Sequence, residues 1–145
     1  MSKVKNALSR FKEDFNCAQS VLSTFSTKYG LDQNIALKIA TGFGGGMGRL
    51  GNTCGAVTGA FMAIGLKHGM GVNKNVNAKE NTYQIIRNFS NKFQEINGSL
   101  MCKELLGCDI NTPEGKEYFS QNELFERKCL QYVKNAVEIL EELNI

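Results

Sequence analysis

The 145-residue sequence has very little of several residue types, and each shortage excludes a class of protein. It contains a single histidine, His68, which excludes sites that need two imidazole ligands, such as the His-Glu-x-x-His zinc hydrolases. One proline and no tryptophan leave little to interrupt long helices. Because the formal net charge is only +3 and the Lys and Arg residues are scattered, we expect no nucleic-acid partner.

The sequence also lacks a long apolar segment. Its most apolar run, Cys54 to Leu66, is shorter than the roughly 20 residues that a membrane-spanning helix needs. The charged residues near the start contain no apolar core of a signal peptide. We therefore expect a cytoplasmic protein with no membrane insertion. In that reducing compartment, five cysteines indicate metal binding or redox chemistry rather than a disulfide framework.

Helical periodicity runs through almost the whole sequence, and no segment shows the alternation typical of a strand. The patterns predict helices over residues 6–14, 54–68, 78–96 and 125–143, a helix from the N-cap Asn16 to Gly30, and helices that start at Asp32, Ser99 and Thr112. We expect an all-α fold with one domain over residues 1–145, a single compact bundle of about six to seven helices.

Small residues recur at every fourth position around the predicted helix Cys54–His68: Gly51, Gly55, Gly59 and Ala63. A ridge of small residues lets another backbone approach closely. We therefore expect this helix to be the buried centre of the bundle. Methionines usually fill gaps in a core. Together with this helix, four methionines could instead form the contact surface of a homodimer: Met47, Met62, Met70 and Met101.

Three of the five cysteines, Cys17, Cys54 and Cys102, lie in the first turn of a predicted helix. Free N–H groups and the positive end of the helix dipole favour a thiolate at such positions. Cys108 follows a short helix, and Cys129 starts the core-facing stripe of the last helix. Since no Cys-x-x-Cys pair occurs, a shared site must be assembled by tertiary folding. Inert burial as small apolar residues remains an alternative.

Six glycines crowd residues 42–51, directly before the predicted helix at Cys54. Residues 46–51 match G-x-G-x-x-G, but no strand precedes them and no acidic residue follows at about 20 positions, so dinucleotide binding is not expected. Backbone amides of such a loop can instead bind an anion or a cluster. The candidate binding residues are Gly44, Gly45, Gly46, Gly48 and Arg49. A tight turn between crowded helices would explain the glycines equally well.

A set of short segments in a fixed order carries a family resemblance. The segments are Asn16-Cys17-Ala18-Gln19-Ser20-Val21, Gly42-Phe-Gly-Gly-Gly-Met-Gly48, Cys54-Gly55-Ala56-Val57-Thr58-Gly59, Cys102-Lys-Glu-Leu-Leu-Gly107, and Cys129. Together they resemble the C-GCAxxG-C-C family of redox-active proteins, with Thr53 where the family name has a glycine. The resemblance places the family cysteines at Cys17, Cys54, Cys102 and Cys129, with Cys108 as a fifth candidate. It also implies a small redox or metal protein associated with a transport system.

Three functions remain open. In the first, an iron–sulfur cluster or other metal ion is bound by Cys17, Cys54, Cys102 and either Cys108 or Cys129, for electron transfer to an unidentified redox partner or for sensing. In the second, a metal-free thiol–disulfide oxidoreductase uses a low-pKa Cys54 as its attacking thiol. In the third, a structural helical module pairs with a partner and its thiols are inert. We rank them in this order, and whether the protein is an enzyme stays open.

Overall fold

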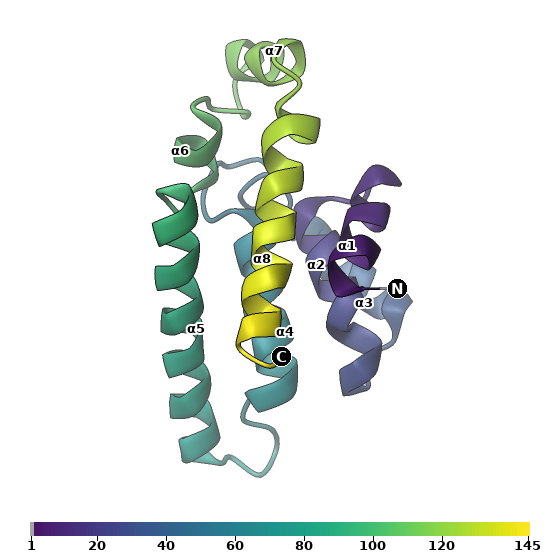
Figure 1. Cartoon of the computed structure of the whole chain (residues 1–145), viewed down its shortest axis with the longest axis vertical. Coiled ribbons are helices and arrows are strands. Elements are labelled where there is room, and N and C mark those ends of the chain that lie inside the picture. Colours follow the sequence, from purple (N-terminus) through teal and green to yellow (C-terminus); the bar gives the residue numbers. More distant parts are fainter. Residues whose placement is uncertain (1) are drawn as a thin grey trace.

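The structure, a computed structural model, describes residues 2–145, and its regular secondary structure in this range is helical (Figure 1). The α-helices are α1 (Lys3–Lys12), α2 (Cys17–Ser26), α3 (Gln33–Ala40), α4 (Gly55–His68), α5 (Val76–Asn97), α6 (Cys102–Leu106), α7 (Pro113–Gln121) and α8 (Leu130–Glu142). Two 3-10 turns, Thr27–Tyr29 and Thr41–Phe43, and a π-helical segment, Phe125–Cys129, join them. The predicted all-α class is confirmed, and the eight helices exceed the six to seven that we expected.

Side-chain caps determine where several helices begin, as the sequence predicts. Asn16 and Gln19 form a complete capping box at the start of α2: Asn16 Oδ1 accepts from Gln19 N, and Gln19 Oε1 accepts from Asn16 N, both at 2.9 Å. Asp32 caps α3. Thr112 caps α7, whose first residue is Pro113.

Four predicted helix starts differ from the observed ones by one to three residues, at α1, α4, α5 and α6. The first helix starts before residue 6 because Ser2 caps it. Helix α4 starts at Gly55, because Cys54 takes the N-cap position and Thr53 pairs with Met101 in an isolated β-bridge. The same bridge moves the start of α6 beyond Ser99. Long-range backbone pairing therefore replaces local capping at both places.

Helices α2 and α4 are in close contact at the small residues of α4. A Cβ atom on Gly59 would lie 2.8 Å from Ala18 O, and one on Gly55 would lie 3.1 Å from Ala18 N. A side chain at Gly59 would force the two backbones to shift, and one at Gly55 would make a tighter contact than most Cβ atoms do, so the small residues let the helices approach closely. The predicted close approach is confirmed at these two residues, whereas Gly51 lies in the loop that precedes the helix.

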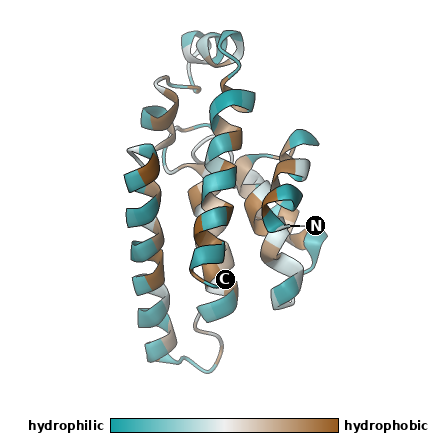
Figure 2. Ribbon diagram, in the orientation of Figure 1, coloured by the Kyte–Doolittle hydropathy of each residue, from teal (hydrophilic) through white to brown (hydrophobic). Residues whose placement is uncertain are grey.

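Helix α4 also packs against α5 and α8, and we call these three helices the stem. Figure 2 shows that α5 is largely hydrophilic on its outer side. Its buried line follows Thr82, Phe89 and Phe93. Tyr83 and Ile96 of the same helix are 49% and 57% exposed. In the described part of the chain, none of the helices has the length and apolar character of a membrane span.

Candidate functional site

A cavity of about 800 Å³ lies where α2, α4 and α6 begin and where the π-helical segment leads into α8. Four buried cysteines line it: Cys17, Cys54, Cys102 and Cys129. They come from four separate segments, as the lack of a Cys-x-x-Cys pair requires. The structure therefore brings together four of the five cysteines that the sequence singled out. We call this end of the molecule the cysteine end.

The β-bridge between Thr53 and Met101 places two of these cysteines next to each other. Two backbone hydrogen bonds flank the bridge, from Cys54 N to Leu100 O (2.8 Å) and from Cys102 N to Asn52 O (2.7 Å). Because α4 begins directly after Cys54 and α6 begins at Cys102, the bridge holds the starts of both helices together.

The other two cysteines line the same cavity from α2 and from the π-helical segment. Cys17 is the first residue of α2, and Cys129 is the last residue of the π-helical segment. The sequence predicted a regular helix from Phe125, and the π-helical turn was missed. That turn is anchored by the ring of Phe125, which stacks on Phe11 at a centroid distance of 4.2 Å. Such π-helical turns occur frequently at functional sites.

Burial contributes to a raised pKa at three of the cavity thiols, those of Cys17, Cys54 and Cys102. It raises the pKa of Cys54 to about 12, although the N–H groups of Ala56 and Val57 act in the opposite direction. Burial and the nearby cysteines raise the pKa of Cys102 to about 12. The neighbouring Cys129 side chain, followed by burial, raises the pKa of Cys17 well above its usual value. The expected low pKa of Cys54 is therefore wrong, because burial outweighs the helix start.

Tyr132 also lines the cavity, and the sequence interpretation missed it. Its hydroxyl donates a hydrogen bond of 2.8 Å to Leu105 O, which ties α8 to α6. Burial, with the neighbouring Cys129 as the next cause, raises the pKa of Tyr132 to about 12. A usable signal was its position three residues after Cys129, which places both side chains on one face of the helix.

The glycine-rich segment turns in the left-handed sense beside the cysteines. From Gly45 to Arg49, five consecutive residues have φ between 59° and 68°. Glycine adopts such angles freely, whereas Met47 and Arg49 do so at a cost. Hydrogen bonds across the segment hold it, among them Asn52 N to Gly46 O at 2.9 Å. All the candidate binding residues of this segment line the cavity: Gly44, Gly45, Gly46, Gly48 and Arg49.

Hydrogen bonds between side chains and backbone connect α2 to the end of α3 at the cavity wall. Asn16 Nδ2 donates to Thr41 O (3.0 Å), and Gln19 Nε2 donates to Leu37 O (3.0 Å) and to Thr41 Oγ1 (3.1 Å). The residues that cap α2 therefore also position Cys17, the first residue of that helix.

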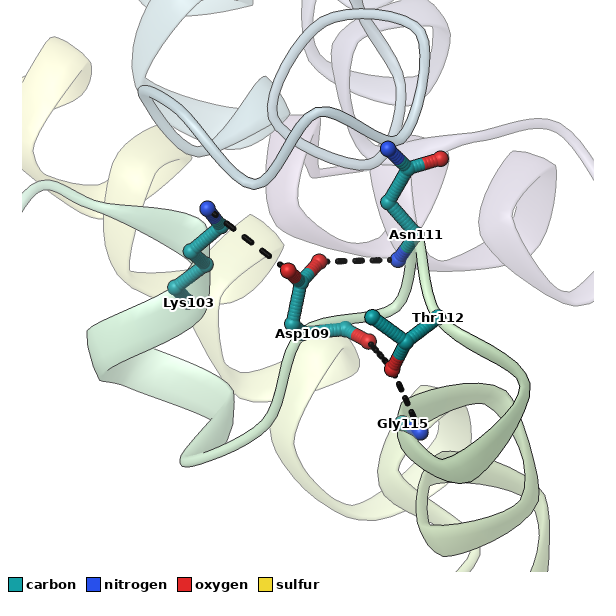
Figure 3. Close-up of polar contacts among 5 residues, drawn as sticks. All are labelled: Lys103, Asp109, Asn111, Thr112 and Gly115. Atoms are coloured by element: carbon teal, nitrogen blue, oxygen red, sulfur yellow. Dashed lines mark hydrogen bonds and ion pairs between the residues drawn. The ribbon is translucent and has the colours of Figure 1, made fainter.

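Cys108 is only half-buried and is not among the residues that line the cavity. The turn that carries it is held by Asp109 (Figure 3). The Asp109 carboxylate pairs with Lys103 at 3.7 Å and accepts a hydrogen bond from Asn111 N, while its carbonyl accepts one from Thr112 Oγ1, both at 2.9 Å. Of the two candidates for the fourth position, Cys129 therefore faces the cavity and Cys108 does not.

The donor atoms at the cavity are all thiol sulfur, the ligand type of zinc and of iron–sulfur clusters. Four thiolates around one zinc ion, each at about 2.3 Å, must lie about 4 Å from one another. In residues 2–145, no three Cys, His, Asp or Glu side chains are arranged so that they could bind a single metal ion. The arrangement thus does not support a mononuclear site.

Comparisons with known proteins match most of the chain. A family model described as "Putative redox-active protein (C_GCAxxG_C_C)" matches residues 15–143, which include the glycine-rich segment and all five cysteines. An uncharacterized protein of Archaeoglobus fulgidus is 28% identical over 143 residues, covering 93% of this chain and 88% of the relative. No solved structure matches the chain.

Proposed function

Because the chain belongs to the C_GCAxxG_C_C family of redox-active proteins, we propose that the four cavity cysteines form its redox centre. The observation that carries this proposal is the meeting of four buried thiols, from four distant segments, at one cavity of about 800 Å³. Cysteines that only fill space pack tightly against their neighbours and leave no such room.

The centre is an iron–sulfur cluster bound by Cys17, Cys54, Cys102 and Cys129. Four cysteine thiolates are the usual ligand set of such clusters. A cluster binds its thiolates through different iron atoms, so they can be further apart than the ligands of a single ion. When bound, the cluster supplies one-electron transfer for electron carriage or sensing.

The electrostatics of the site support metal coordination more than a free thiolate. The raised pKa of Cys54 and that of Cys102 leave both residues protonated, and the protonated thiol is a poor nucleophile. A bound metal deprotonates its thiol ligands. The N–H groups of Ala56 and Val57 then stabilise the negative charge on the Cys54 sulfur. Metal binding to the reduced protein therefore releases protons.

The position of Cys17 and Cys129 at one cavity, where Cys129 has the largest influence on the pKa of Cys17, favours a second function, thiol–disulfide exchange without a metal. In this reaction the two thiols would lose two electrons and two protons and form one S–S bond. An external low-molecular-weight disulfide would accept both and become two thiols. Cys54 is not the attacking residue of this alternative, because burial raises its pKa to about 12.

Anaerobic purification followed by iron and acid-labile sulfide analysis tests the proposed cluster. We expect a brown protein whose broad visible absorption is lost in Cys54→Ser and retained in the control Cys108→Ser, which removes the one cysteine outside the cavity lining. A colourless protein without iron contradicts the cluster. In that case, a Cys17–Cys129 disulfide found by mass spectrometry after treatment with oxidised glutathione supports the second function.

A further inference from the structure

The cavity extends beyond the thiols to exposed charged residues. Arg49 and Lys116 line it together with one carboxylate, that of Asp14. The ion pairs found in residues 2–145 are Lys92–Glu142 and Lys103–Asp109, so neither cation of the cavity is neutralised by a salt bridge there. The outer part of the cavity thus presents two unpaired positive charges against one negative charge.

The backbone and the packing both fix the position of Arg49. Its φ of 63° is unusual for a residue with a side chain, and such conformations persist where the surroundings hold them. Arg49 N donates to Gly44 O at 3.2 Å. A Cβ on Gly45 would lie 2.8 Å from Arg49 Cγ, so the aliphatic part of the arginine rests directly on this glycine. The aliphatic part of the Arg49 side chain, which carries the guanidinium group, therefore has a defined position at the cavity.

The neutral polar side chains of the cavity wall are already engaged. The amide groups of Asn16 and Gln19 bond to each other's backbone and to the end of α3. Thr41 Oγ1 donates to Leu37 O at 2.8 Å. Because these groups have partners, recognition of a ligand at this wall falls to the two cations.

We infer that the outer part of the cavity binds a small anion, a carboxylate or a tetrahedral oxyanion, beside the cysteines. A guanidinium group pairs with either anion through two parallel hydrogen bonds, and a lysine adds a point charge. The cavity volume lies within the range of small-molecule sites, about 300–1,000 Å³. The role of this anion as a substrate of the redox centre rests on the proposed function. The binding of the anion does not, and it can be measured separately.

Isothermal titration calorimetry on the full-length protein, as isolated under anaerobic conditions, tests this inference. The probes are succinate, inorganic phosphate and the neutral succinamide at constant ionic strength. We expect saturable binding of at least one anion and none of succinamide. Binding of succinate alone identifies a carboxylate site, and binding of phosphate alone a site for tetrahedral oxyanions.

Variants assign the binding to the two cations. Arg49→Gln and Lys116→Gln each weaken anion binding by about tenfold or more. Arg49→Gly does the same while suiting the left-handed backbone, which guards against a folding defect. The matched control is Arg87→Gln, which removes an exposed arginine of α5 that donates to Gln84 and leaves the affinity unchanged.

Two results would overturn the inference: no saturable binding of either anion, or equal affinity in the wild type and in the Arg49 and Lys116 variants. A protein that contains the cluster yet binds no anion retains the proposed function and loses this inference. A protein that contains neither cluster nor reactive disulfide, yet binds the anion through Arg49 and Lys116, supports the site and refutes the redox proposal.

Discussion

The stem and the cysteine end of the molecule are built in contrasting ways. In the stem, regular helices enclose large, fully buried side chains: Ile64, Phe89, Phe93 and Leu140. At the cysteine end, a left-handed turn, a β-bridge and a π-helical turn surround an open cavity. Buried apolar area supplies most of the stability of a domain, whereas strained backbone concentrates at functional sites. The contrast indicates that the packed core and the candidate site occupy different parts of the molecule.

The largest expected effect tests the stem. Phe89 is fully buried, with ring centroids 6.0 Å from Phe61 and 6.1 Å from Phe93. Phe89→Ala should lower the free energy of unfolding by about 3–5 kcal/mol, because it removes a buried ring and leaves a cavity. Urea denaturation of the reduced protein measures this loss. A loss below about 1 kcal/mol would show that the stem does not dominate stability.

A smaller effect is expected at the contact between α2 and the stem. Gly59→Ala should cost about 1–3 kcal/mol, because the new methyl group meets the backbone of Ala18. The matched control is Gly65→Ala in the same helix, where a Cβ has no neighbour within 4 Å. This control should stabilise the protein by about 0.5–1 kcal/mol, since alanine favours helix. Equal effects of the two changes would contradict the described helix contact.

The smallest effect, when it is counted per pH unit, concerns the cysteine end. The pKa of Cys54 is about 12 in the folded protein, above its value in the unfolded chain. Its contribution to stability is therefore complete below about pH 8.5 and is lost as the pH rises toward 12. Over that interval Cys54 should lower the free energy of unfolding by about 1.4 kcal/mol per pH unit. Urea titrations of the reduced, metal-free protein at a series of pH values from 8 to 11 give the free energy of unfolding at each pH. This free energy should fall less steeply with pH for Cys54→Ala than for the wild type. Parallel slopes would show that this thiol is not buried.

Much of the fold was predictable because its signals are local. Side-chain caps at Asn16, Asp32 and Thr112 depend on residues three positions away, and the sequence shows them directly. The contact of Gly55 and Gly59 with α2 follows from their spacing along one helix face. The same kind of reasoning predicted that three cysteines lie at helix starts.

The rest of the site depends on contacts between distant segments. No local pattern announces the pairing of Thr53 with Met101, which moves the starts of two helices. The left-handed conformation at Met47 and Arg49 opposes the preference of these residue types and requires hydrogen bonds from the whole segment. The raised pKa of Cys54 likewise results from burial, which only the complete fold provides.

The spread of the four cavity cysteines along the chain has a consequence for biosynthesis. A ribosome produces the chain from its N-terminus, so Cys17, Cys54 and Cys102 emerge well before Cys129. The Cys129 sulfur reaches the others only after α8, which follows it, has docked against α2 and α4. Until that moment the early thiols are accessible to passing oxidants and metal ions. The proposed centre would consequently be completed late, after its last ligand Cys129 has joined the other three cysteines.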